Sequence, residues 1–245
     1  MTRQPWIGGW VYDVTLILAP GFLVSAALLC FPGYFREHEL TPLTWAILIV
    51  GFDVSHVYGT LYRTYFDPME FRARRTLYLL VPLFGWLAFA GLYSLGAMVF
   101  WRVLAYLAAF HFVRQQYGFM MIYRREERAW PAIDKAAIYA ATLYPLIWWH
   151  THDRAFSWFI EGDFLHLPIP WIADAAMVVY VLILVTYGFK EVLLWRRTRR
   201  FNLPRNLLLI GTALSWWSSI ILLNSDLGFT AANVISHAVP YMALI

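Results

Sequence analysis

Residues 43–62 read LTWAILIVGFDVSHVYGTLY, a long apolar run that carries Asp53 and His56 near its centre. Its length matches the roughly 20 residues that an α-helix needs to cross a hydrocarbon core about 30 Å thick. An ionisable side chain inside that core costs about 2.5–3.5 kcal/mol on insertion scales, so each one needs a partner or a water-filled cavity. The stretch therefore predicts a transmembrane helix with a functional polar face.

The composition extends this prediction to the whole chain of 245 residues. Hydrophobic residues make up 61% of it and charged residues only 14%, whereas soluble domains carry about 25% charge. Apolar blocks long enough to span a bilayer recur along the sequence, separated by charges, Pro or Gly. We expect an all-α, polytopic transmembrane helix bundle that forms one domain over residues 1–245. About eight spans are predicted, at about 10–31, 43–62, 76–92, 95–114, 136–152, 171–189, 206–223 and 229–245.

The distribution of positive charge predicts the orientation. Lys and Arg cluster after the second, fourth and sixth predicted spans, as Arg72 and Arg75, Arg124 and Arg125, and Arg196 and Arg197 illustrate, whereas the alternate loops are mainly acidic. By the positive-inside rule, the basic loops and the N-terminus face the cytoplasm. The net charge of +4 then reflects membrane topology, and we expect no nucleic-acid partner. We expect an integral protein of a bacterial cytoplasmic membrane, with membrane lipids as partners.

Two segments depart from the pattern of spans. Residues 154–170, RAFSWFIEGDFLHLPIP, are too rich in charge and proline to span, so we expect a short helix or re-entrant turn at the outer interface. The chain stops inside its eighth apolar block without a polar flank, and we expect a C-terminal truncation with one or more helices missing.

Three histidines lie on different predicted spans that all run in the same direction. They are His56, His111 and His237, in the middle or cytoplasmic half of spans two, four and eight. The single cysteine, Cys30, excludes a cysteine-based zinc or iron–sulfur site, so any metal needs His and carboxylate ligands. Imidazole with carboxylate suits non-haem iron, zinc or manganese. We therefore predict one metal site with His56, His111 and His237 as ligands.

Carboxylates and other polar residues accompany these histidines. Asp53 lies three residues before His56 on the same helical face, and Asp13 enters from the cytoplasmic side of the first span. Either one is predicted to ligate the metal or to orient a ligand. Arg114 and Gln115 continue the polar face of His111, with Gly118 as a small residue for close helix approach, and are predicted to bind a substrate headgroup or polarise oxygen.

The functional hypothesis is a membrane metal-dependent oxidoreductase, with iron or another divalent metal, acting on a lipid or isoprenoid small molecule. Haem held by two histidines is an alternative cofactor. Two alternative functions are a proton-coupled transporter, with helices broken at Pro20, Pro82, Pro145 and Pro240, and a structural or assembly subunit whose polar faces hold helices together. No H-E-x-x-H, P-loop or nucleophile-elbow motif occurs in the sequence.

A second histidine group lies at the outer end of the fifth predicted span, in the stretch WWHTHD at 148–153. His150 and His152 have H-x-H spacing with Asp153 beside them, and His166 follows in the outer loop. Because residues two apart on a helix point in different directions, we interpret this group as polar residues at a water interface.

Overall fold

The chain folds almost entirely into helices. The computed structural model describes residues 4–245, and no strand occurs in that range. A π-helical stretch continues or precedes an α-helix at three places. The elements are α1 (Trp10–Tyr12), η1 (Asp13–Leu18), α2 (Ala19–Cys30), α3 (Pro32–Glu37), α4 (Pro42–Trp45), η2 (Ala46–Val54), α5 (Ser55–Arg63), α6 (Pro68–Ala73), α7 (Arg75–Ser94), α8 (Ala97–Tyr123), α9 (Pro131–Thr151), α10 (Pro170–Thr198), α11 (Leu203–Trp216), η3 (Trp217–Leu223) and α12 (Asp226–Leu244).

Six helical segments within the described residues are long and apolar enough to cross a membrane. They are Trp10–Cys30, Pro42–Arg63, Arg75–Ser94, Ala97–Tyr123, Pro170–Thr198 and Leu203–Leu223. Helices α9 and α12 coincide with the two remaining predicted spans and have 21 and 19 residues. The predicted all-helical, membrane-type fold is confirmed, whereas the count of eight spans stays a prediction because α9 and α12 are not among the six.

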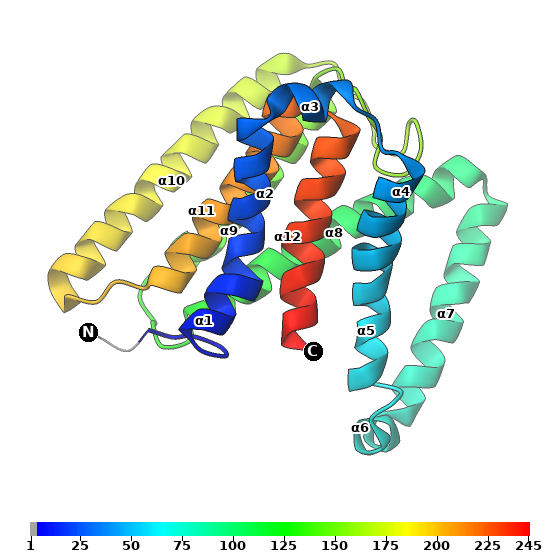
Figure 1. Ribbon diagram of the computed structural model, residues 1–245, viewed down its shortest axis with the longest axis horizontal. Coiled ribbons are helices and arrows are strands. Elements are labelled where there is room, and N and C mark those ends of the chain that lie inside the picture. Colours follow the sequence, from blue (N-terminus) through cyan, green and yellow to red (C-terminus); the bar gives the residue numbers. More distant parts are fainter. Residues whose placement is uncertain (1–3) are drawn as a thin grey trace.

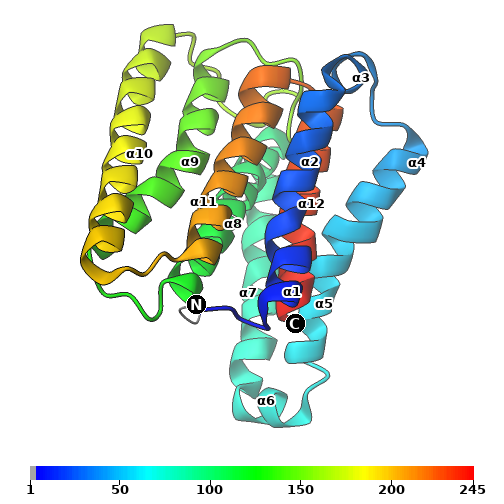
Figure 2. The same ribbon diagram turned by 60° about the vertical axis from the view of Figure 1, so that its left-hand side comes forward.

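The helices run up and down between two ends of the bundle. Both chain termini and α6 lie at one end, and α3 lies at the other (Figure 2). Helix α6, which Arg74 and Arg75 follow, and the turns after α8 and α10 therefore share the end that holds the termini (Figures 1 and 2). This is the grouping that the charge pattern predicts, and its assignment to the cytoplasm stays a prediction.

Helix α12 lies in the centre of the helices that hold the candidate site. It packs against α2, α11, η2 and α5 (Figure 1). The Ser225 hydroxyl caps it by accepting from Gly228 N at 3.2 Å. A Cβ at Gly228 would lie 2.7 Å from Ser225 Oγ, so only glycine fits this tight first turn. Most of the side chains of α12 are buried, including His237.

Helix α7, in contrast to α12, lies at the surface of the molecule along its whole length. None of its residues is buried, and it packs mainly on α8 at the edge of the molecule (Figure 1). Its exposed side chains are nearly all apolar, from Leu77 to Tyr93. A fully exposed apolar helix is consistent with contact with lipid.

Residues 152–169 form turns and bends over the α3 end of the bundle and contain no helix. The fully buried Asp163 holds this loop together by accepting from Phe159 N at 2.6 Å and Phe164 N at 2.8 Å. Aromatic rings from the loop and from neighbouring helices stack above the bundle, and we call this group the aromatic cap. It consists of Trp149, Phe156, Trp158, Phe164 and Phe229. The short helix expected within residues 154–170 is not formed.

Helices α7, α9 and α12 continue through Pro82, Pro145 and Pro240 without a break. Pro20 lies where the π-helical η1 runs into α2, inside the continuous helical segment Trp10–Cys30. The interrupted helices expected of a carrier with a midplane site are therefore not found at these prolines.

Candidate metal centre

Three helices bring the predicted histidines together. His56 comes from α5, His111 from α8 and His237 from α12, and one ligand nitrogen from each lies within 4.8 Å of the other two. The ring centroids of His56 and His237 are 4.6 Å apart, and those of His111 and His237 are 4.8 Å apart. We call these three residues the histidine cluster. Helical periodicity predicted that each faces the bundle, and the fold adds that they face one another.

The spacing of the nitrogens fits a single metal ion. His56 Nε2 and His237 Nε2 are 3.1 Å apart. Two nitrogens bound to one ion at about 2.0–2.1 Å, with an angle of about 90–110° at the metal, lie roughly 2.9–3.4 Å apart. Bound nitrogens cannot be more than about 4.2 Å apart, so the 4.8 Å limit requires at most a small movement of His111. His56 and His237 thus already have the separation of two adjacent ligands.

Packing holds His237 firmly. Its side chain is 1% exposed and stacks on the Phe112 ring with centroids 3.9 Å apart. The Gln115 side-chain amide donates to the backbone carbonyl of His237 at 2.9 Å. Phe112 also meets Trp158 of the aromatic cap edge-on at 5.4 Å. No sequence pattern distinguished Phe112, because aromatic residues are frequent throughout the predicted spans.

His56 and His111 differ in exposure. His56 is 4% exposed and follows the π-helical η2, whereas His111 is exposed on the surface of α8. Leu107, one turn before His111, is 47% exposed, and Val57 of α5 is 59% exposed. The histidine cluster is therefore closed on the α12 side and open beside His111, toward an apolar surface.

Several buried polar atoms around the cluster have no hydrogen-bond partner in the described chain. They are His56 Nδ1, His237 Nδ1, Asp53 Oδ1, Gln115 Oε1 and Asn233 Oδ1. Asn233 is one helical turn before His237 on α12 and is 2% exposed. Buried polar groups are nearly always paired, so a concentration of unpaired ones indicates that a ligand or water completes this region.

Asp53 lies beside the cluster, outside the group of possible ligands. Its Oδ1 is 3.5 Å from His56 Nδ1, and only the three histidines form the group that could hold an ion. When His56 Nε2 binds a metal, its Nδ1 carries the proton and needs an acceptor. Of the two roles predicted for Asp53, the geometry favours the orienting one.

Asp13, the other predicted carboxylate, lies elsewhere in the fold. It is fully buried and accepts from Ile7 N at 2.7 Å and Gly8 N at 2.8 Å, so it holds the N-terminal turn before α1. The residues that could hold an ion do not include it. Its role is to satisfy backbone donors, and we do not retain it as a ligand.

Arg114 also points away from the cluster. Its Nη1 donates to the Tyr139 hydroxyl of α9 at 2.9 Å, and its guanidinium lies 4.8 Å from the centre of the Tyr117 ring. A Cβ added at Gly118 would meet no atom within 4 Å, so no helix approaches closely there. Of the residues predicted to contact the substrate, only Gln115 lies next to the cluster.

The outer histidines do not gather into a second site. His150 Nε2 pairs with the Tyr106 hydroxyl at 2.9 Å, and the His152 ring stacks on Trp148 at 4.5 Å. His166 Nε2 is 3.9 Å from Asp153 Oδ1. Within residues 4–245 only the histidine cluster groups three possible ligands.

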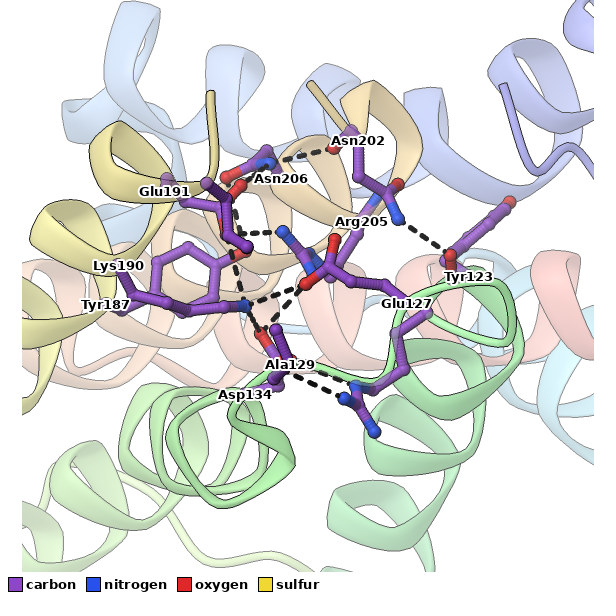
Figure 3. Close-up of polar contacts among 12 residues, drawn as sticks. Tyr123, Glu127, Ala129, Asp134, Tyr187, Lys190, Glu191, Asn202, Arg205 and Asn206 are labelled. Carbon is purple, nitrogen blue, oxygen red and sulfur yellow. Dashed lines mark hydrogen bonds and ion pairs between the residues drawn. The ribbon is translucent and has the colours of Figure 1, made fainter. Parts of the chain in front are cut away.

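The structure also contains a network of buried charges that the sequence did not predict. Asp134, Lys190 and Arg205 are at most 1% exposed and belong to three different helices, α9, α10 and α11. The network consists of Arg124, Glu127, Asp134, Lys190, Glu191 and Arg205, and we call it the ion-pair network (Figure 3). Three cations face three carboxylates, so its charge balances. Lys190 and Arg205 looked like ordinary loop cations because both follow an apolar span.

Comparison of the chain with protein-family models, with curated proteins and with solved structures finds no match.

Proposed function

We propose that this integral membrane protein binds one divalent metal ion at His56, His111 and His237 and is a non-haem, iron-type oxidoreductase. Its proposed substrate is a lipid or isoprenoid molecule, and its proposed location is a bacterial cytoplasmic membrane. The observation that carries the proposal is the convergence of three imidazoles, two of them buried, at 4.8 Å or less.

The ligand set supports an ion with open coordination positions. Three protein nitrogens leave one or more positions free, as in catalytic metal sites. Imidazole ligands suit iron, zinc and copper, and iron with open positions supplies dioxygen activation when it is bound. In this arrangement His56 and His237 would hold the ion from the buried side, Asp53 would accept a hydrogen bond from His56 Nδ1–H, and Gln115 stiffens α12 at His237.

The exposure of the cluster supports a membrane-dissolved substrate. The open side lies beside His111, and the exposed Leu107, one turn before His111 on α8, presents apolar surface there. An apolar molecule in the bilayer can approach that side without crossing the aromatic cap or the buried face of α12.

The alternatives have less support. Two axial histidines of one haem iron would hold their nitrogens about 4 Å apart, twice a bond of about 2.0 Å, with the porphyrin between them. The 3.1 Å between the nitrogens of His56 and His237 is too short for these two to be the axial pair. The uninterrupted α7, α9 and α12 remove the feature that favoured a carrier.

Metal analysis of purified protein tests the site. We expect about one tightly bound ion per chain in the wild type after anaerobic loading with Fe²⁺, and almost none in His111→Ala. His111 is the best position because its side chain is exposed, so its removal should leave the fold intact. His38→Ala is the matched control, since His38 is an exposed histidine in the loop after α3. Equal metal content in all three proteins would contradict the proposal.

The reaction class has a separate test. Oxygen uptake by the iron-loaded wild type in nanodiscs should increase when isoprenoid lipids are added, and His111→Ala should show no increase. A wild type that binds iron and consumes no oxygen with any membrane lipid extract would remove the oxidoreductase assignment and leave the metal site.

A further inference from the structure

The lipid-facing side of α9 is flanked by two apolar grooves that share one ridge. The ridge consists of Tyr139, Leu143 and Ile147. The groove between α8 and α9 has a volume of about 650 Å³, and the groove between α9 and α10 has about 420 Å³. Apart from the Tyr106 and His150 pair at its far end, the first groove is lined almost wholly by apolar side chains, and so is the second.

Two cations meet at the Tyr139 end of this ridge. The guanidinium of Arg114 donates to the Tyr139 hydroxyl at 2.9 Å, and Lys135 Nζ lies 6.0 Å from the centre of the Tyr139 ring. Both side chains are exposed, and neither forms an ion pair with any carboxylate of residues 4–245. Nearby cations of the ion-pair network, in contrast, are fully matched by acidic groups.

Because Arg114 and Lys135 have no carboxylate partner within the described residues, an anion from outside the chain can bind them. Arg114 lies within a helix long and apolar enough to span a membrane, where an unpaired charge is costly and marks a functional site by default. Arginine and lysine together, with a tyrosine hydroxyl between them, are suited to the oxygens of a phosphate group.

The two grooves provide apolar surface on which the acyl chains of a phospholipid can lie. Both pass beside Tyr139 and continue past Leu143 and Ile147, which lie about 6 Å and about 12 Å further along α9 at 1.5 Å per residue. One ridge with a groove on each side matches a lipid with two chains and one headgroup. Since α9 begins at the end of the bundle that holds α6 and the termini (Figure 2), the headgroup would lie toward that basic end.

We propose that Arg114, Lys135 and Tyr139 bind the phosphate of one anionic diacyl phospholipid, whose two chains lie in the grooves on either side of Leu143. An anionic headgroup is preferred because a zwitterionic one brings its own cation next to Arg114 and Lys135. Basic pockets at the cytoplasmic ends of transmembrane helices recognise anionic lipids in this way. The site is separate from the histidine cluster and does not depend on a metal.

Spin-labelled lipids test the site directly. The protein is placed in phosphatidylcholine nanodiscs, and the immobilised fraction of chain-labelled phosphatidylglycerol is compared with that of chain-labelled phosphatidylcholine. We expect the wild type to prefer phosphatidylglycerol by about fivefold or more, the effect of about one juxtamembrane cation. Arg114→Gln with Lys135→Gln should abolish that preference. The matched control, Arg72→Gln with Arg75→Gln, removes the same charge from exposed positions at the same end and should keep it.

A second variant tests the grooves without changing charge. Leu143→Trp fills both grooves, because Leu143 lines each of them, and should reduce the immobilised fraction of phosphatidylglycerol. Leu83→Trp, on the exposed face of α7, should not. The proposal is overturned if the two double variants have the same lipid preference. It is also overturned if the double variant of Arg114 and Lys135 loses its selectivity for labelled stearate, an anionic lipid without a phosphate, but keeps its selectivity for phosphatidylglycerol.

Discussion

The histidine cluster and the ion-pair network both bring ionisable side chains from several helices together, but they satisfy those side chains in opposite ways. In the network, Arg124 Nε is 2.9 Å from Asp134 Oδ2, and Lys190 and Arg205 each contact more than one carboxylate (Figure 3). Around the cluster, five buried polar atoms have no hydrogen-bond partner in the described chain, although Asp53 Oδ1 and His56 Nδ1 lie 3.5 Å from each other. The network is charge-balanced without a ligand and leaves only Arg205 Nε without a hydrogen-bond partner, whereas unpaired atoms are concentrated around the cluster.

This difference separates a structural polar group from a functional one. A charge-balanced network ties α9, α10 and α11 together, and Asn206 and Tyr187 extend it with hydrogen bonds of 2.7 Å and 3.2 Å. A group of imidazoles with unmatched nitrogens gives the fold little by itself. The energetic consequences of mutation should therefore be opposite at the two places.

The largest effect on stability is expected from breaking the ion-pair network. Lys190→Met removes the cation that contacts Asp134, Glu127 and Glu191, and leaves two arginines to balance three carboxylates in a largely buried site. Removing one partner of a buried pair typically destabilises a protein by about 3–5 kcal/mol. Equilibrium unfolding in mixed micelles should show a loss of this size.

An exposed ion pair provides the control for that experiment. Arg74 Nε is 3.3 Å from Glu70 Oε1 on α6, with side chains 63% and 30% exposed. Arg74→Met should change the free energy of unfolding by about 0–1 kcal/mol, because water screens the pair. Comparable losses for Lys190→Met and Arg74→Met would mean that the network is not the structural element described here.

The second largest effect is expected at the histidine cluster and concerns metal binding. His111→Leu should change the stability of the metal-free protein by less than about 0.5 kcal/mol, as expected for an exposed side chain without a structural partner. The same variant should remove the stabilisation by metal, which for the wild type reaches about 4 kcal/mol at 1,000 times the dissociation constant. Thermal unfolding with and without Fe²⁺ measures both quantities. A variant that still gains the full stabilisation would exclude His111 as a ligand.

The sequence predicted the helices and the three histidines because both follow from local patterns. Apolar length identifies a span, and polar residues three or four apart identify its inward face. His56, His111 and His237 each occupied such a face, so their convergence needed only that α5, α8 and α12 be neighbours.

The remaining assignments depended on information that no local pattern contains. Asp13 and Arg114 are also polar residues in apolar segments, but which neighbour each meets is decided by the order of helices around the bundle. Asp13 meets the backbone of the N-terminal turn, and Arg114 meets α9. The ion-pair network was missed because Lys190 and Arg205 fit the positive-inside pattern as loop residues, whereas α10 continues to Thr198 and buries Lys190.

A smaller effect is expected from the carboxylate that faces the cluster. Asp53→Asn keeps the shape of the side chain and removes the charge beside His56 Nδ1, 3.5 Å away. Loss of an orienting partner typically lowers metal affinity by about 10–100-fold. Competition with a chelator of known affinity measures the change, and Asp153→Asn in the outer loop is the matched control. If Asp53→Asn abolishes binding as fully as His111→Ala does, Asp53 is itself a ligand.

The smallest effect is expected from Tyr241, whose ring meets the His56 ring edge-on at 5.4 Å while its hydroxyl pairs with the Thr60 hydroxyl at 2.9 Å. This hydroxyl, unlike His56 Nδ1 and His237 Nδ1, already has a hydrogen-bond partner in the protein. Tyr241→Phe should therefore cost about 0.5–1.5 kcal/mol of stability, the net value of one hydrogen bond, and leave metal affinity within about twofold. Adding Thr60→Val completes a double-mutant cycle, which should show a coupling energy of about 1 kcal/mol between the two positions. A large loss of metal affinity in Tyr241→Phe would assign Tyr241 to the metal site. The hydrogen bond between Tyr241 and Thr60 would then not mark Tyr241 as a purely structural residue.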